Sequence, residues 1–222
     1  MPDPPYAIHA RLSLTRRAAG TWTLARLHAP IEREIRAAGG RAVQAERSGD
    51  REREEGALDD EWERVEELLG LAFIAAQSFI TGVRNRVVTV YESGTSPRPS
   101  FCSDAKGYTL LTMGSPLRRG ASYTAVEAIN AVANYSKHQD DWRTREEKKG
   151  RQLVTVWEPR ANERRTSEIA TDLGMAPYAT GNIRTAAKKL GIKEFRNLAP
   201  VREELRFWAE RVYEAVRAHI AP

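Results

Sequence analysis

The sequence is poor in cysteine and histidine, and it lacks the glycine-rich loops that bind phosphate. Cys102 is the only cysteine among 222 residues, so no disulfide can form within the chain and cysteines cannot build a zinc site. The four histidines are scattered, and no two stand at the i, i+4 spacing that lets a helix hold a metal ion. Neither GxxxxGKS/T nor GxGxxG occurs, so the usual signals of nucleotide binding are missing. We therefore expect no metal and no cofactor.

Long apolar runs and targeting signals are also missing. No uninterrupted apolar stretch approaches the roughly 18 residues that are needed to cross a bilayer. Arg11, Arg16 and Arg17 are not followed by an apolar core, so we expect no signal peptide. A single cysteine suits a reducing compartment. These absences predict a soluble, cytoplasmic protein without a membrane contact.

The positive charge is unevenly distributed along the chain. Residues 1–60 carry ten basic and ten acidic side chains, and residues 61–141 carry eight and nine. Residues 142–222 carry seventeen and eleven, which gives the last third a net charge of +6 (17 minus 11). Clustered positive charge supplies the salt-dependent part of nucleic-acid affinity, although a solvated basic surface has the same composition. The charge therefore favours nucleic acid as a partner.

The strongest structural signal is one long amphipathic helix. Apolar residues recur at steps of three and four from Trp62 to Val90, which is the pattern of one helix face. Acidic residues crowd its start, where they favour the positive end of the helix dipole. A helix over about 59–91 would extend roughly 50 Å and needs partners along its length. We predict a mainly α fold, a helical bundle around this central helix, with at most a short strand or hairpin.

Two regions are predicted along the chain. Residues 1–57 are expected to form an N-terminal helical and charged extension, and residues 58–222 a mainly α-helical domain. In the extension, a helix over about 21–37 is expected to end at the Gly39-Gly40 pair. Residues 41–55 are charged and weakly apolar, which is typical of a linker or a solvated helix.

The rest of the chain alternates loops with further elements. Residues 92–116 are rich in Ser, Gly and Pro, with strand-like residues only at 108–111, so a long loop or a small hairpin is expected. Thr124 and Glu127 form the pattern of a capping box that opens a helix. Residues 151–157 have the composition of a short strand. Further helices are predicted at about 160–173, 182–190 and 200–220.

The helix opened by the capping box carries a polar stripe. At about 100° per residue, five polar side chains fall within one quadrant beside the apolar face: Asn130, Asn134, Lys137, His138 and Asp141. A histidine can give or take a proton near neutral pH, and a lysine can neutralise a phosphate. This combination suits cleavage of a phosphodiester by a ribose 2′-hydroxyl. The candidate catalytic groups are His138 as acid/base, Lys137 as cation, and Asn134 and Asp141 as positioning groups.

A structural interpretation of the stripe stays open. A single histidine near the C-terminus of a helix is often a cap or a satisfied interior residue. Asn130 and Asn134 are equally suited to hydrogen bonds between helices. The stripe therefore predicts either an active site or a polar helix–helix contact.

The stretch from Asn134 to His138 resembles the helix motif of HEPN-domain proteins, which are all-helical bundles common in bacterial defence and toxin systems. Many of those are metal-independent ribonucleases with an Arg, a polar residue such as Asn, three further residues and a His. Asn134 and His138 match the second and last positions, whereas Ala133 stands at the Arg position. The resemblance implies either a relative that does not cleave or a different catalytic cation. The alternative cations are Lys137, Arg84 and Arg86.

Residues 160–190 resemble a helix-turn-helix unit. Ile169, Ala170 and Leu173 fit a first helix that crosses its partner closely at a sharp turn. The candidate nucleic-acid-binding residues on or near the second helix are Asn182, Arg184, Lys188 and Lys189. The apolar position that should follow the turn falls late, at Ile183, so two ordinary helices joined by a loop are the alternative.

Three classes of function follow from these patterns. The leading hypothesis is a HEPN-like nucleic-acid-associated protein, either a metal-independent ribonuclease or an RNA-binding component of a bacterial defence or toxin system. RNA is the favoured partner, and DNA is the alternative through a helix-turn-helix regulator. The third class is a non-enzymatic helical protein that pairs with a second copy or with a partner protein.

Overall fold

A computed structural model of the chain describes residues 22–46, 51–93, 97–149, 152–160, 163–193 and 195–220. The α-helices in these ranges are α2 (Trp22–Glu46), α3 (Arg51–Ser93), α4 (Ala125–His138), α5 (Arg164–Asp172), α6 (Asn182–Lys189) and α7 (Ala199–Ile220). The strands β1 (Thr144–Lys149) and β2 (Gln152–Trp157) form one antiparallel hairpin. The prediction of a mainly α bundle around a long central helix, with at most a hairpin, is confirmed for the described ranges.

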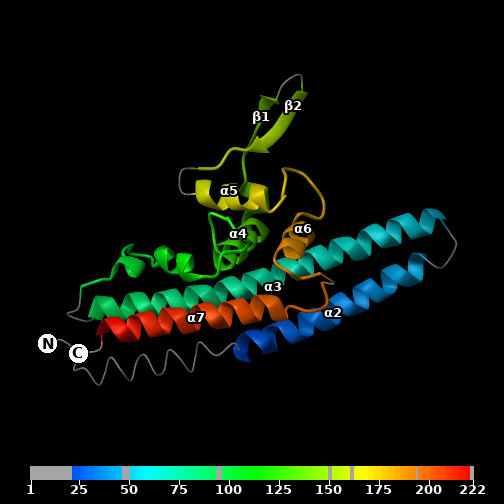
Figure 1. Cartoon of the computed structure of the whole chain (residues 1–222). Coiled ribbons are helices and arrows are strands. Elements are labelled where there is room, and N and C mark those ends of the chain that lie inside the picture. The colour runs from blue at the N-terminus through cyan, green and yellow to red at the C-terminus, as the bar shows by residue number, and fades with distance from the viewer. Residues whose placement is uncertain are drawn as a thin grey trace.

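The long helix α3 is the spine of the molecule (Figure 1). Its 43 residues extend about 65 Å at the usual rise per residue. α2 runs antiparallel along its N-terminal part, as ion pairs from Arg41 to Glu61 and from Arg64 to Glu34 show. α7 lies along its C-terminal part, while α4 and α6 pack against it from another side. The hairpin and α5 stand farthest from this spine.

The core follows the apolar stripe that the sequence predicts for α3. Phe73 and Ile80 of α3 are fully buried, together with Leu205 and Trp208 of α7. The Trp208 indole Nε1 donates a hydrogen bond of 2.7 Å to the Leu110 carbonyl, so the largest core side chain also has its polar atom satisfied. Each such side chain contributes roughly 1.5–3 kcal/mol through removal of its apolar surface from water.

The first helix is longer than predicted. α2 continues through Gly39-Gly40 to Glu46, and α3 already begins at Arg51, so the predicted boundary at residue 57 falls inside α3. Glycine weakens a helix by only about 1 kcal/mol, and contacts with α3 outweigh that loss. Ala38 is fully buried, and the Arg41 guanidinium is paired with Glu61. Residues 47–50, which suggested a linker, lie outside the described ranges.

The segment predicted as a loop or hairpin contains two short 3-10 helices. They are η1 (Ser100–Cys102) and η2 (Tyr108–Met113), so residues 108–111 are not a strand. The Asp104 carboxylate accepts hydrogen bonds from the backbone N–H groups of Lys106, Tyr108 and Thr109. Burial alone would raise the pKa of Asp104, but these bonds and one from the Thr109 hydroxyl outweigh it and lower the pKa to about 2.

The capping box and the C-terminal elements are confirmed. The Thr124 hydroxyl accepts from the Glu127 N–H, and the Glu127 carboxylate accepts from the Thr124 N–H, at the start of α4. The predicted strand at 151–157 corresponds to β2, which pairs with β1. The hairpin is attached to α4 by three aromatic rings, Tyr135, Trp142 and Trp157, in mutual edge-to-face contact.

α3 is long and apolar enough, by composition alone, to cross a membrane. Residues 58–92 of α3 contain an 18-residue window of mean hydropathy 1.3, of which 44% is buried. Polar residues such as Gln77 interrupt this segment, so a search for uninterrupted apolar runs overlooks it. The central helix of a soluble bundle has the same composition, and α3 packs against α2, α4, α6 and α7. The packing therefore fits a soluble bundle, and the cytoplasmic location stays a prediction.

His28 ties α2 to α3 from inside the core. Its side chain is fully buried, and its Nε2–H donates to the Ala72 carbonyl at 3.1 Å, while Nδ1 has no partner among the described residues. Burial, assisted by the Arg202 charge, lowers the pKa of His28 to about 4, against the opposing effects of its hydrogen bond and of Glu32. The imidazole is therefore neutral in the folded protein.

The stability of the fold is expected to decrease as the pH falls from about 7 to about 5. In that range the unfolded chain binds a proton at residue 28, whereas the folded protein keeps His28 neutral. The free energy of unfolding is therefore expected to fall by about 2 kcal/mol. Urea denaturation at several pH values measures this loss. His28→Leu should remove most of it, whereas the exposed histidine variant His219→Leu should retain it. Equal pH dependence in His28→Leu and in the wild type would contradict this account.

Candidate nucleic-acid interface

The polar stripe of α4 faces α3 for much of its length. The Gln77 amide of α3 donates to Asn130 Oδ1 at 3.0 Å and to Asn134 Oδ1 at 2.5 Å. The Lys137 ammonium donates to Gln77 Oε1 at 2.5 Å. One glutamine therefore connects three successive turns of α4, and the interhelical interpretation of Asn130 and Asn134 is correct in this structure.

A close approach of α3 and α4 makes these bonds possible. Gly70 of α3 has no side chain, and an added Cβ would lie 3.4 Å from the Ser136 Cβ of α4 and 3.3 Å from the Ile183 methyl of α6. Three helices therefore meet at Gly70. Its lack of a side chain brings Gln77, two turns further along α3, within reach of α4.

His138 and Asp141 lie outside the Gln77 network. His138 is the last residue of α4, and the chain then enters a 3-10 turn, η3 (Gln139–Asp141). The His138 Nδ1 lies 3.5 Å from Asp141 Oδ2, and 57% of the His138 side chain is exposed. Of the two predicted positioning groups, Asp141 therefore lies beside the imidazole, whereas Asn134 bonds to Gln77.

In the HEPN motif an arginine stands where this chain has Ala133, and a cation at that position would not reach this surface. Ala133 is completely buried, so its side chain points into the core. Arg84 is also buried, where it donates to the Lys106 and Gly107 carbonyls and lies over the Tyr108 ring. Lys137 is exposed and stands next to His138, so it is the cation that α4 offers.

The two helices of the helix-turn-helix-like stretch pack against different neighbours. α5 packs on α4, whereas α6 packs mainly on α3. Asn182, a predicted base-reading residue, is only 3% exposed. Its amide group donates to the Tyr135 hydroxyl and the Ala176 carbonyl, and its oxygen accepts from the Ala176 N–H. Asn182 therefore organises the loop before α6 and is not available to a DNA groove.

The cations of α6 also have partners within the chain. The Arg184 guanidinium contacts Glu66 at 3.3 Å and lies over the Trp62 ring. The Lys189 ammonium donates to the Asp172 carbonyl at 2.7 Å. The Lys188 ammonium lies 5.6 Å from the centre of the Phe195 ring and is exposed. Of the four predicted residues, Lys188 presents the most accessible charge.

The hairpin and the residues beside it carry functional candidates that sequence reasoning did not find: Arg143 and Tyr178 at its base, and Lys148 and Lys149 at its tip, where β1 ends. Arg143, Lys148 and Lys149 are exposed and form no ion pair with any other described residue. Tyr178 is 84% exposed, and its hydroxyl lies 2.8 Å from the Thr144 hydroxyl at the start of β1. Its backbone has a φ of 58°, a costly left-handed conformation for an aromatic residue and one that is enriched at functional sites.

Comparison with known proteins adds no family to this picture. The chain matches no family model, no curated protein and no solved structure. No group of three or more His, Cys, Asp and Glu side chains in the described ranges is placed to hold a metal ion. The candidate interface, made of the end of α4, the hairpin and Tyr178, is therefore described from the structure of this chain alone.

Gln77→Met should destabilise the protein by about 1–3 kcal/mol. Methionine has a similar shape but leaves the buried Asn130 amide without its partner and Lys137 without an acceptor. Urea denaturation of the variant measures the loss. Ser78→Ala is the matched control, because Ser78 is exposed and bonds only to Ile74 within α3. Equal stability of Gln77→Met and the control would show that the network contributes nothing.

Asn182→Ala should also lower the unfolding free energy by about 1–3 kcal/mol, because it removes the three hydrogen bonds that join the loop before α6 to Asn182 and to α4. Lys188→Ala, on the exposed side of the same helix, should change stability by less than about 0.5 kcal/mol. Thermal and urea denaturation measure both. A stable Asn182→Ala protein that binds duplex DNA less tightly than the wild type would restore the recognition-helix interpretation.

Proposed function

We propose that the protein is a HEPN-like nucleic-acid-associated protein that contacts RNA through the end of α4 and along the hairpin. The observation that carries the proposal is the grouping of exposed cations and an exposed aromatic ring around this region. Lys137 and His138 end α4, and Arg143 follows within a few residues. Tyr178 is held beside β1 by its bond to Thr144. Lysine and arginine neutralise phosphates, and an exposed ring offers a stacking platform for an unpaired base.

Single-stranded RNA suits this surface better than duplex DNA. The residues of α6 that would read a major groove already have partners within the chain. Asn182 is hydrogen-bonded to Tyr135, and Arg184 is paired with Glu66. A stacking ring beside a short basic hairpin requires bases that are not paired. The helix-turn-helix alternative is supported only by Lys188.

His138 is the group that would cleave the bound RNA. Its imidazole would take the proton of a ribose 2′-hydroxyl, and the 2′-oxygen would attack the adjacent phosphorus. The 5′-oxygen would leave and take a proton from solvent, which yields a 2′,3′-cyclic phosphate. Lys137 would neutralise the phosphate, and Asp141 would orient the imidazole. Asn134 would act as a positioning residue, because its bond to Gln77 fixes the end of α4.

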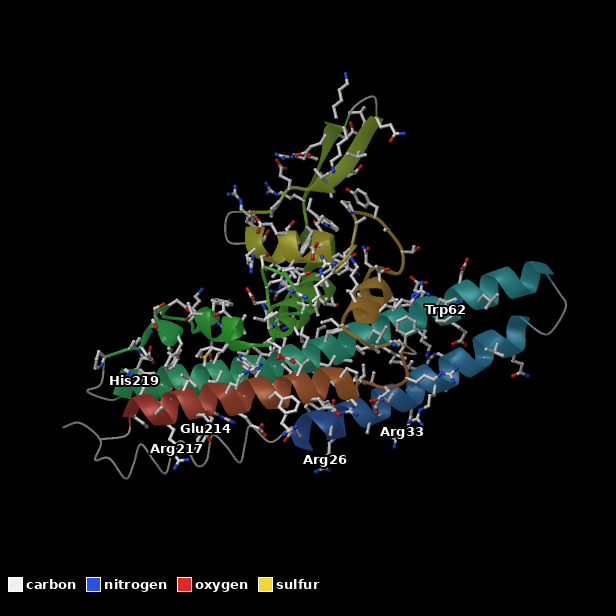
Figure 2. All side chains as sticks on the ribbon, in the orientation of Figure 1. Arg26, Arg33, Trp62, Glu214, Arg217 and His219 are labelled. Carbon is white, nitrogen blue, oxygen red and sulfur yellow. The ribbon has the colours of Figure 1, made fainter. Side chains whose placement is uncertain are left out.

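His138→Ala is expected to lower the rate of cleavage of a labelled single-stranded RNA at least about a hundredfold, as expected for loss of a general base. RNA affinity should change by no more than a few-fold. The matched control is His219→Ala, because His219 is also exposed but lies at the far end of α7 against Pro97 (Figure 2). Equal cleavage by wild type and His138→Ala would eliminate the catalytic role.

The same RNA also tests the binding surface. Lys148→Ala and Lys149→Ala should each reduce the slope of log affinity against log salt by about one. Tyr178→Ala should weaken binding at all salt concentrations, because it removes a stacking contact worth about 1–3 kcal/mol. Lys106→Ala, which removes an exposed cation elsewhere, should change nothing. Unaltered affinity in all three interface variants would refute the proposed surface.

A further inference from the structure

A groove of about 740 Å³ lies between α3, the end of α4 and the loop that precedes α6. One wall of the groove is formed by α3, from Asp59 to Ile74. The other wall consists of Tyr135 and Ser136 of α4, Gln139 of η3 and the loop residues Ala179 to Gly181. This groove borders the cationic surface proposed for RNA, since Gln139 follows His138 and Ala179 follows Tyr178, but none of the cations of that surface lines it.

The part of the groove near α4 is apolar and open. Leu71 is 54% exposed, although it belongs to the central helix of the bundle. Ile74 is half-buried one turn further along the same wall, and Tyr135 faces them from α4. Large apolar side chains on a central helix normally lie under a neighbouring element, so this stretch offers a partly uncovered face.

The part of the groove near the start of α3 is acidic. Asp59, Glu63 and Glu67 recur every four residues, so they form one row on α3, and all three are exposed. No ion pair joins any of them to another described residue. Along this wall, therefore, three carboxylates have no cationic partner within the part of the chain that the structure describes.

The one arginine in the groove is already neutralised. The Glu66 carboxylate accepts from the backbone N–H groups of Ile183 and Arg184 and from the Arg184 guanidinium. Glu66 thereby satisfies the start of α6, and Arg184 is held over the Trp62 ring. Because this pair is internal, the charge that a ligand meets is that of the acidic row.

We propose that the groove binds a basic amphipathic helical segment of a partner protein. Its apolar side chains would cover Leu71 and Ile74, and its lysines or arginines would meet Asp59, Glu63 and Glu67. The row from 59 to 74 spans about 22 Å, which matches a helix of about 15 residues. Helices commonly bind in such grooves through apolar anchors spaced by three and four residues. The uncompensated carboxylates repel RNA, so this site is independent of the nucleic-acid function.

Selection from a phage-displayed library of random peptides of about 15 residues, against the full chain, tests the chemistry of the ligand. The selected peptides should carry lysine or arginine toward one end and leucine, isoleucine or phenylalanine toward the other. Glu63→Gln combined with Glu67→Gln should raise the Kd of a selected fluorescent peptide about tenfold at low salt. Leu71→Ser should raise it at least about fivefold.

Matched controls separate the groove from the rest of the surface. Glu203→Gln removes an exposed carboxylate on α7, and Leu27→Ser removes a leucine of similar exposure on α2, so neither should change the Kd. Circular dichroism confirms that each variant is folded. Selected peptides without a basic bias, or unchanged affinity in the groove variants, would overturn the proposal. A dimer in light scattering that Leu71→Ser dissociates, or an RNA that displaces the peptide competitively, would overturn it as well.

Discussion

Burial of the apolar stripe along α3 is the constraint on which the rest of the structure depends. A helix of 43 residues exposes too much apolar surface for any one neighbour to cover, so α2 and α7 divide its length between them. α4 and α6 cover a third side, where Gly70 allows them to approach closely. Since α4 carries the hairpin and the loop before α6 carries Tyr178, the position of the candidate interface follows from how α3 is covered.

The crossing of α3 and α4 also decides which polar groups remain available for function. Gln77 engages Asn130, Asn134 and Lys137, so most of the stripe stabilises the contact between the helices. Only His138, the last residue of α4, and the 3-10 turn after it lie outside this contact, and there His138 meets Asp141 at the surface. A polar contact within the bundle and a reactive end of the same helix are therefore compatible, because they occupy successive turns.

Local patterns predicted the elements whose causes are local. The spacing of apolar residues identified α3, and the Thr124/Glu127 pair identified the start of α4. The extension of α2 through Gly39-Gly40 was not predictable in this way, because it depends on the packing of α2 along α3, in which Ala38 is fully buried. Helix propensity alone gives the wrong end at this position.

The candidate site shows the same division. The residues of the stripe were predictable from a helical projection, but their main partner, Gln77, is more than 50 residues away in the sequence. Asn182 has the residue type and position of a base-reading residue, and only its burial against Tyr135 and Ala176 excludes that role. Tyr178 gave no sequence signal, because its exposure and its backbone conformation arise from the folded loop.

Crosslinking of a single-stranded RNA containing 4-thiouridine to the wild-type chain, followed by mass spectrometry of the crosslinked peptides, tests the central claim most directly. It locates the RNA without altering any residue. The account predicts crosslinks at Tyr178 and within residues 137–149, which extend from the end of α4 to the tip of the hairpin. Crosslinks confined to α6, or to α2 and the start of α3, would contradict it.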